Sequence, residues 1–315
     1  MKTRKLGRTG LDVSILSFGA SSLGGVFHEV DEAEAIRTVH EAVDLGMNFI
    51  DVSPYYGLTK SEAVLGKAIA GLRRDQFYLS TKAGRYGADA FDFSAKRITA
   101  SIDESLRRLN TDYVDILYLH DIEFGSLRQV VEESIPAINR LKEQGKIRFT
   151  GISGLPLSIF RTVLAESEVD SILSYCRYSL NDTSLLDLVP LLASKQIGIV
   201  NASPLSMGLL SGKEPPAWHP ASSRIREVCS RTAQLCRENG IDLPKLAIQF
   251  AVADERIPTT LVSTANPANI RKNAAWAQEE PDKEQLEQVR EWLKPIHNET
   301  WLSGRPENNE EEQAG

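Results

Sequence analysis

The chain has few of the residues that mark metal-binding or redox proteins. Its 315 residues include three cysteines, Cys176, Cys229 and Cys236, and no pair of them has C-x-x-C spacing. An odd number of widely spaced cysteines fits a reducing compartment. Cys229 and Cys236 are seven residues apart in a helical pattern, so we interpret them as packing residues on one helix face. We therefore expect no metal site.

Long apolar runs and dense clusters of basic residues are also missing. The apolar runs are much shorter than a membrane span, which needs about 20 residues. The formal net charge of −7 argues against nucleic acid or an anionic membrane as a partner. The basic start MKTRKLGRTGLDVS is not followed by the apolar segment of a secretory signal. We expect a cytoplasmic protein with a small-molecule partner, and the oligomeric state stays unknown.

Short apolar runs alternate with longer amphipathic segments along the chain. Helical patterns occupy 31–46, 94–110 with Ser94 as the N-cap, and 126–145. Strand-like runs cover 14–20, 47–53, 77–83, 113–120, 147–153, 169–175, 197–203 and 259–264. Eight strands that alternate with helices predict an α/β fold, a closed (β/α)8 TIM barrel. An open doubly wound sheet is disfavoured because the G-x-G-x-x-G fingerprint is missing after the first strand.

Three elements are added to this barrel pattern. They are an N-terminal β-hairpin cap over 3–14, an extra helix over 227–240 after the seventh strand, and a helix over 282–296 near the C-terminus. A Gly/Pro-rich loop over 204–224 precedes the extra helix, and we consider it as a lid. We expect a single barrel domain over 1–302 and an acidic, flexible tail over 303–315.

Polar residues stand near the ends of three successive predicted strands. Asp51 ends the second strand, Lys82 lies near the end of the third, and His120 ends the fourth. The chemistry of such barrels takes place at the carboxyl ends of the strands. Tyr56 lies in the loop after Asp51. A buried carboxylate is costly without a partner, so we expect Asp51 to pair with Lys82.

These four side chains fit acid–base chemistry. An ammonium group near a phenol favours the phenolate, so we expect Lys82 to lower the pKa of Tyr56 and make it a proton shuttle. His120 is placed to hydrogen-bond the same substrate oxygen. Each residue alone has an ordinary structural explanation, but their occurrence at three consecutive strand ends favours a catalytic site. None of them stores electrons, so a redox reaction needs a bound cofactor.

Several segments resemble the aldo-keto reductase superfamily, in order and with similar spacing over about 4–301. They are DVSPYYG followed by SEAVLGKAI, then STKAG, DYVDILYLHD and IRFTGIS. Members of this superfamily are NAD(P)-dependent (β/α)8 oxidoreductases with an Asp, Tyr, Lys and His tetrad. The resemblance implies that Tyr56 is the general acid and base. It also implies that Lys82 and Asp51 tune Tyr56, and that His120 positions the substrate.

A narrower resemblance links loops at the catalytic end with the L-galactose dehydrogenases of this superfamily. It rests on GASSLGGVF, AFDFSAKRI, LHDIEFGSL, GISGLPLSIF and SILSYCRYSLNDTSLLDL. The resemblance implies oxidation of L-galactose, or a closely related aldose, at C1 to the aldonolactone with NAD. Tyr56, His120 and Asp121 are the implied sugar contacts. Other aldoses, such as L-fucose and D-arabinose, and pyridoxal stay open as substrates.

The superfamily resemblance also implies cofactor contacts. These residues are Gly19, Ala20, Ser21, Ser153, Tyr175, Ser203, Leu205, Ser206, Ser263, Asn269 and Asn273. NADP-preferring members carry basic residues after the last strand, where this chain has Ser263 and Asn269, and neither neutralises a 2′-phosphate. NAD is favoured, although Arg271 and Lys272 lie close by. Many relatives have Asn after the residue matching Ser153, whereas this chain has Gly154.

Two other functions stay open. A broad-specificity NAD(P)H-dependent aldehyde and carbonyl reductase would combine the same tetrad with an apolar pocket, whereas the polar segments HDIEF and SYCRYSLND favour a sugar. A nucleotide-sensing binding subunit on the same fold would bind a nucleotide with weak catalysis. The complete tetrad favours an enzyme.

Overall fold

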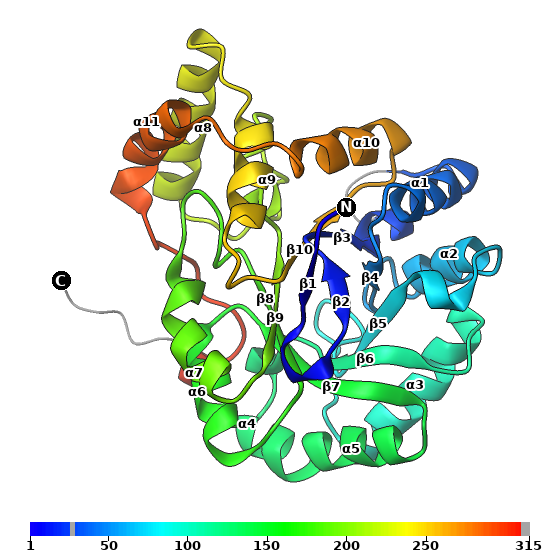
Figure 1. Ribbon diagram of the computed structural model, residues 1–315. Helices are drawn as coiled ribbons and strands as arrows, with labels where there is room; N and C mark the ends of the chain where they lie inside the picture. The colour runs from blue at the N-terminus through cyan, green and yellow to red at the C-terminus, as the bar shows by residue number, and fades with distance from the viewer. Residues whose placement is uncertain (26–28, 310–315) are drawn as a thin grey trace.

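The computed structural model describes residues 1–25 and 29–309, and a closed barrel of parallel strands lies at its centre (Figure 1). Among these residues the strands follow the order β10-β3-β4-β5-β6-β7-β8-β9 around the barrel. They are β3 (Leu16–Gly19), β4 (Phe49–Asp51), β5 (Tyr78–Ala83), β6 (Val114–Leu119), β7 (Ile147–Gly154), β8 (Ser171–Tyr175), β9 (Gly198–Ala202) and β10 (Thr259–Ser263). Each predicted apolar run overlaps one of them, which confirms the TIM barrel.

Helices surround the barrel (Figure 1). They are α1 (Glu32–Asp44), α2 (Lys60–Ile69), α3 (Ala95–Leu109), α4 (Leu127–Gln129), α5 (Ile135–Glu143), α6 (Leu157–Glu166), α7 (Val189–Ser194), α8 (Ser223–Glu238), α9 (Leu243–Ala253), α10 (Pro267–Trp276) and α11 (Lys283–Leu293). The side chain of Ser94 caps α3 as predicted, since it accepts a hydrogen bond from Arg97 N at 3.3 Å. The predicted helix over 126–145 contains a π-helical turn at Val130–Ser134, just before Pro136, which lacks a backbone N–H.

The predicted N-terminal hairpin is present and closes the amino end of the barrel. It consists of β1 (Thr3–Lys5) and β2 (Asp12–Ser14), which pair antiparallel. Leu6, Leu11 and Val13 are buried against apolar side chains inside the barrel. The hairpin therefore closes one end of the barrel and leaves the other, carboxyl end for a site.

The two extra helices are also confirmed. α8 begins at Ser223, earlier than predicted, because the side chain of Ser222 accepts a hydrogen bond from Ile225 N at 3.2 Å. α11 packs beside α8 (Figure 1). Cys229 and Cys236 are buried free thiols on α8, as a packing role requires.

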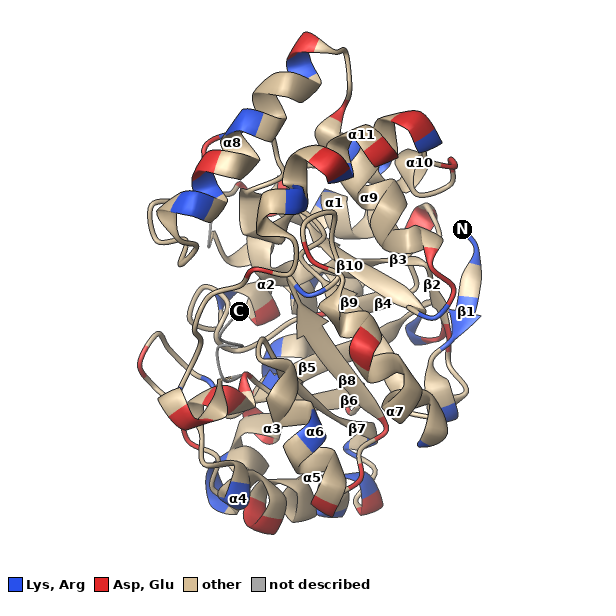
Figure 2. Ribbon diagram, turned by 90° about the vertical axis from the view of Figure 1, so that its left-hand side faces the viewer, with Lys and Arg blue, Asp and Glu red and all other residues tan. Residues whose placement is uncertain are grey.

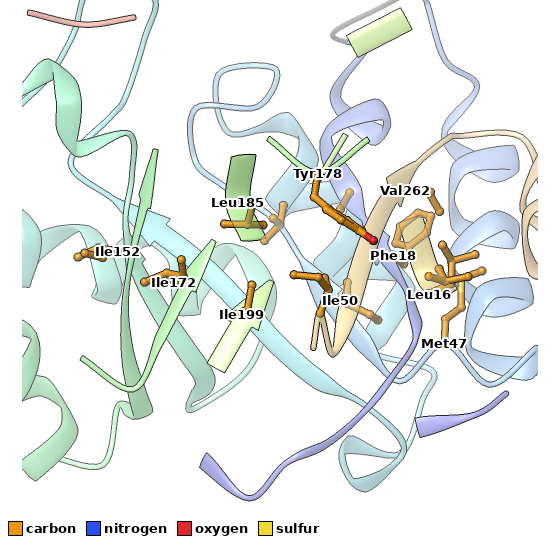
Figure 3. Packing of buried hydrophobic residues seen from close by; sticks show 14 of the residues in the cluster. Leu16, Phe18, Met47, Ile50, Ile152, Ile172, Tyr178, Leu185, Ile199 and Val262 are labelled. Carbon is orange, nitrogen blue, oxygen red and sulfur yellow. The ribbon is translucent and has the colours of Figure 1, made fainter. Parts of the chain in front are cut away.

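Strand side chains alternate between two apolar layers. Outward side chains such as Phe18 and Ile50 pack under the helices, and Figure 3 shows Phe18 beside Leu16 and Val262. Inward side chains such as Phe49, Ile116 and Leu173 form a second layer within the barrel. This period of two determines which residues at the strand ends face the barrel interior.

The expectation of a flexible tail from residue 303 is wrong for residues 303–309. Asn308 is buried, and its side-chain amide donates to the carbonyls of Glu123 and Gly125 at 2.8 and 3.0 Å. Ser303 Oγ donates to Glu123 Oε1 at 3.0 Å. These bonds satisfy buried polar groups of the loop after β6, so the segment is fixed to the barrel. Residues 310–315 of the predicted tail lie outside the described residues.

Charged residues lie mainly on the outer helices, where acidic and basic side chains are interspersed (Figure 2). None of the helices within the described residues is long and apolar enough to cross a membrane.

Candidate active site

The alternation along three neighbouring strands directs polar side chains into the carboxyl end of the barrel. Asp51 shares the inward face of β4 with Phe49. On the next strand, Lys82 faces inward, and His120 follows β6 two residues after the inward Tyr118. The predicted residues therefore meet at one place.

Lys82 is the centre of this group. Its Nζ donates to Asp51 Oδ2 at 2.5 Å, to the Val52 carbonyl at 3.0 Å and to Tyr56 Oη at 3.2 Å. Ser80 Oγ donates to the second oxygen of Asp51 at 2.7 Å. Lys82 and Asp51 are only 1% and 3% exposed, so their charges depend on each other. The predicted pair of Asp51 and Lys82 is thus present.

Electrostatics at Tyr56 differ from the simple expectation. Burial raises the pKa of Tyr56 above its ordinary value, and the nearby Lys82 ammonium opposes this rise without reversing it. Burial lowers the pKa of Lys82, but Asp51 and Tyr56 outweigh it and hold that pKa above its ordinary value. Lys82 therefore remains an ammonium that favours the phenolate, while the protein alone keeps Tyr56 protonated at neutral pH.

His120 is a neutral ring. Burial lowers its pKa to about 3. Its Nδ1 lies 2.9 Å from Ser53 Oγ, which also accepts a hydrogen bond from Tyr55 N at 3.1 Å. The Ser53 hydroxyl hydrogen is then available for Nδ1, and this favours the tautomer with the hydrogen on Nε2. The ring stands edge-on to Tyr56, with centroids 5.7 Å apart.

Asp121 and Arg85 form an ion pair beside His120. Asp121 Oδ2 lies 3.6 Å from His120 Nε2 and accepts a hydrogen bond from Arg85 Nη1 at 2.6 Å. Asp121 has a left-handed backbone with φ +50°, and its N–H donates to Ser153 Oγ at 3.1 Å. The sequence reasoning named Asp121 but missed Arg85, three residues after Lys82, although the same criterion of a polar residue following a strand applies to it.

The predicted cofactor residues also lie at the carboxyl end of the barrel. Gly19, Tyr175 and Ser263 end strands β3, β8 and β10, and Ser153 lies in β7. Ala20 and Ser21 follow β3 in a 3-10 turn, Ser203, Leu205 and Ser206 follow β9, and Asn269 and Asn273 lie on α10. Ser21 Oγ donates to Ser263 Oγ at 2.9 Å, so the ends of β3 and β10 are joined.

A third buried acid, Glu123, lies behind this end of the barrel. Glu123 Oε1 accepts hydrogen bonds from Leu155 N at 3.1 Å and Ser303 Oγ at 3.0 Å, and Tyr175 Oη lies 3.4 Å away. Burial, with Asp121 nearby, raises the pKa of Glu123 to about 8. The sequence reasoning included Glu123 only as part of the polar segment HDIEF. In the described part of the chain, no group of three or more His, Cys, Asp or Glu side chains is arranged to hold a metal ion.

A family model for the aldo/keto reductase family matches residues 15–294. The chain belongs to this family. It is 49% identical to an L-galactose dehydrogenase from Arabidopsis thaliana, over 98% of this chain and 99% of that protein. It is 37% identical to a D-arabinose 1-dehydrogenase from Saccharomyces cerevisiae, over 77% and 76% of the two chains. An aldo-keto reductase from Bacillus halodurans in its holo form has 28% identity and a TM-score of 0.78, with 98% and 100% covered.

In this aldo/keto reductase a side chain at Gly154 would require Ile159 and Glu123 to move. A Cβ there would lie 2.3 Å from Ile159 Cδ1 and 2.4 Å from Glu123 Oε2. Glu123 thus occupies the space next to Ser153 that a larger residue would need. The departure noted in the sequence is therefore linked to the burial of Glu123.

Proposed function

We propose that this protein oxidises an aldose at C1 to the aldonolactone with NAD, and that L-galactose is the substrate. The observation that carries the proposal is the hydrogen-bonded series Asp51, Lys82, Tyr56, with the neutral His120 beside Tyr56. The identity of 49% to an L-galactose dehydrogenase over nearly the whole chain supports the choice of sugar.

In this proposal Tyr56 takes up the proton of the C1 hydroxyl group. The nicotinamide of bound NAD supplies the hydride acceptor. Burial raises the pKa of Tyr56, so the phenolate that accepts the proton depends on the Lys82 ammonium 3.2 Å away. Asp51 holds Lys82 in place and keeps it charged. The buried ion pair thus keeps a cation next to the oxygen that changes its protonation state.

His120 positions the reacting oxygen. Its lowered pKa keeps the ring neutral, so it acts as a hydrogen-bond donor through Nε2 rather than as a second acid. Ser53 holds the other ring nitrogen. Tyr56 and His120 can therefore contact the same oxygen from two sides.

The residues at the rim fit a dinucleotide. Ser153 Oγ accepts from Asp121 N, and its hydroxyl hydrogen has no acceptor among the described residues, which suits a carboxamide oxygen. Ser203, Ser206 and Met207 have left-handed backbones with φ of +60°, +47° and +52°, a conformation that occurs in anion-binding turns. We propose that Ser153 and Tyr175 hold the nicotinamide end.

We place the pyrophosphate at the turn after β9 and the adenosine at the start of α10. The pyrophosphate contacts would be Ser203, Leu205 and Ser206. Asn269 and Asn273 would hold the adenosine. The backbone from Gly19 to Ser21 would line the nicotinamide site.

Charges around α10 support NAD over NADP. The two basic residues that follow Asn269 are Arg271 and Lys272, and Arg271 Nη1 is paired with Glu41 Oε2 of α1 at 3.0 Å. Glu34 of α1 accepts a hydrogen bond from Asn266 at the start of α10. α1 and α10 lie side by side (Figure 1), so a 2′-phosphate would meet carboxylates there.

The Ser263 hydroxyl is engaged as well. It accepts a hydrogen bond from Ser22 N at 3.0 Å and from Ser21 Oγ at 2.9 Å. A neutral serine fixed to the preceding turn offers no cation for a 2′-phosphate.

The test is the initial rate of NADH formation with L-galactose, L-fucose, D-arabinose and L-glucose, with NAD and NADP in parallel. We expect selective oxidation of L-galactose with NAD and release of the lactone. Reduction of simple aldehydes with NADPH, without oxidation of any sugar, would instead indicate the broad carbonyl reductase. Binding of NAD without turnover of any substrate would indicate the nucleotide-sensing subunit.

A further inference from the structure

The ion pair of Asp121 and Arg85 lies on the substrate side of His120. Asp121 Oδ2 is 3.6 Å from His120 Nε2, which is too long for a hydrogen bond but close to the spacing of two neighbouring ligand oxygens. Asp121 Oδ1 accepts no hydrogen bond from any described residue, and it is not among the buried side-chain oxygens that lack a partner. This oxygen is therefore free to accept a hydrogen from a bound molecule.

Besides its hydrogen bond to Asp121, Arg85 is held in position by aromatic rings. Its guanidinium carbon lies 4.0 Å from the centroid of Tyr55, 4.9 Å from that of Phe124 and 5.3 Å from that of Phe91. Phe91 and Phe124 stack on each other with centroids 4.4 Å apart. Such contacts fix the plane of a guanidinium while leaving its N–H edge unused.

Most hydrogen-bond donors of Arg85 are unused. A guanidinium has five N–H donors. Arg85 donates one hydrogen bond to a described residue, the bond to Asp121, and its buried Nε has no partner. Its side chain is only 15% exposed, so water replaces these bonds poorly. Buried N–H donors without partners raise the free energy of the folded protein when no ligand is bound.

We propose that Asp121 and Arg85 select substrates that carry a hydroxyl group on the carbon next to the reacting carbon. This inference rests on the proposed function and specifies the substrate class for the same site. The Asp121 carboxylate accepts the hydrogen of that hydroxyl group, and Arg85 donates to its oxygen. Asp121 and Arg85 are specificity-determining residues, because the hydride leaves the neighbouring carbon and the proton leaves the oxygen bound to that carbon.

The distances favour this neighbouring hydroxyl over a more distant one. Oxygens on adjacent carbons of a sugar are about 3 Å apart, similar to a hydrogen-bonded pair. An oxygen bound to His120 Nε2 and its neighbour bound to the Asp121 carboxylate fit this spacing, since Asp121 Oδ2 lies 3.6 Å from Nε2 and the free Oδ1 belongs to the same carboxylate. A substrate without the second hydroxyl leaves a buried carboxylate and a buried guanidinium partly unsatisfied, and such sites reject deoxy analogues strongly.

The alternative is that the pair only fixes the loops after β5 and β6. In that case its removal would lower the activity on every substrate by the same factor. The effect of the neighbouring hydroxyl would not change. Comparing a substrate with its 2-deoxy analogue therefore separates recognition from structural support.

The experiment measures kcat/KM with NAD for L-galactose and 2-deoxy-L-galactose, in the wild type, in Asp121→Asn and in Arg85→Lys. We expect the wild type to prefer L-galactose by about 100-fold or more, and each variant to reduce this preference to less than about 10-fold. The matched control is Asp103→Asn, which removes an exposed carboxylate paired with Lys146 far from the site, and it should keep the wild-type preference.

The possible results distinguish recognition of the neighbouring hydroxyl group from a purely structural role of Asp121 and Arg85. A wild type that oxidises both sugars equally well overturns the inference and leaves the proposed function intact, and this comparison does not depend on any variant being folded. Equal losses on both sugars in Asp121→Asn overturn it in favour of structural support. If the wild type oxidises no aldose, the proposed function itself fails, and the inference falls with it.

Discussion

Lys82 Nζ lies 3.2 Å from Tyr56 Oη, and its other two hydrogen bonds go to Asp51 and to the backbone. The only cation in contact with the phenol is therefore held rigidly by a buried carboxylate, as far as the described residues show.

Removing the phenol should abolish most of the turnover. In Tyr56→Phe we expect kcat/KM to fall by about 10²–10⁴, the usual contribution of a general acid or base. Steady-state assays with L-galactose and NAD check this. Tyr113→Phe is the matched control, because Tyr113 precedes β6 at the opposite end of the barrel and should keep full activity. Unchanged activity in Tyr56→Phe would remove Tyr56 from the mechanism.

The pH profile should report the environment of Tyr56. Because the phenolate accepts the proton, kcat/KM for oxidation should rise with pH up to the pKa of Tyr56 and then level off. In Lys82→Met the cation that lowers this pKa is lost, so the midpoint should move about 1–3 pH units higher. Stopped-flow measurement of the hydride step gives both profiles. An unshifted midpoint in Lys82→Met would contradict the electrostatic role of Lys82.

Releasing Arg271 should change the choice of cofactor. In Glu41→Gln the guanidinium loses its partner and can meet a 2′-phosphate. We expect NADP to bind up to about 5-fold more tightly, since one ion pair near a surface contributes up to about 1 kcal/mol, while NAD affinity stays constant. Fluorescence titration measures both affinities. Glu104→Gln, a partly buried acid on α3 that pairs with Arg97, is the control and should change neither.

The inside of the barrel should not tolerate a methyl group at Gly151. A Cβ there would lie 2.4 Å from Cδ1 of Tyr118, whose ring passes over β7 to contact Ser171 on β8. We expect Gly151→Ala to lower the free energy of unfolding by about 1–3 kcal/mol through overpacking. Gly71→Ala has no atom closer than 4.0 Å and should stay within about 0.5 kcal/mol of the wild type. Urea denaturation compares the two.

Stability should fall with rising pH because of Glu123. Burial raises its pKa from the ordinary 4.5 to about 8, so the folded protein holds a proton that the unfolded chain has lost in this interval. The stability that depends on this proton is complete below pH 4.5 and is lost as the pH rises to about 8. The slope is at most about 1.4 kcal/mol per pH unit.

Glu123→Gln tests this linkage, because glutamine does not titrate. Its stability relative to the wild type should increase between pH 5 and pH 8, as measured by urea denaturation at several pH values. Glu307→Gln, an exposed residue of the same C-terminal segment, is the control and should follow the wild type. Parallel curves for Glu123→Gln and the wild type would show that Glu123 is charged in the folded protein.

Much of this fold could be predicted because the sequence patterns of its strands and helices are local. The runs around Phe49, Leu79 and Leu117 have the length and composition of buried strands. The longer amphipathic segments between the strands predict helices. The period of two then indicates which residues at the strand ends face inward, and Asp51 and Lys82 follow that rule. Their pairing could be predicted because β4 and β5 are neighbours along the chain as well as in the barrel.

Other features escaped prediction because they depend on contacts between distant segments. Ser303 bonds to Glu123, which is 180 residues away in the sequence, and the acidic composition after residue 303 gave the wrong expectation of a flexible segment. Arg271 pairs with Glu41 over 230 residues. The pKa of Tyr56 was expected to fall, because the presence of Lys82 can be read from the sequence whereas the extent of burial cannot.

By itself, the sequence determined the barrel and the four residues at its carboxyl end, since both follow from side-chain periodicity and chain order. Only the tertiary structure decided which charges are satisfied and which stay free, as at Asp121 and Arg85. Burial and pairing are properties of the three-dimensional surroundings of a group, and the cost of an unsatisfied charge depends on both.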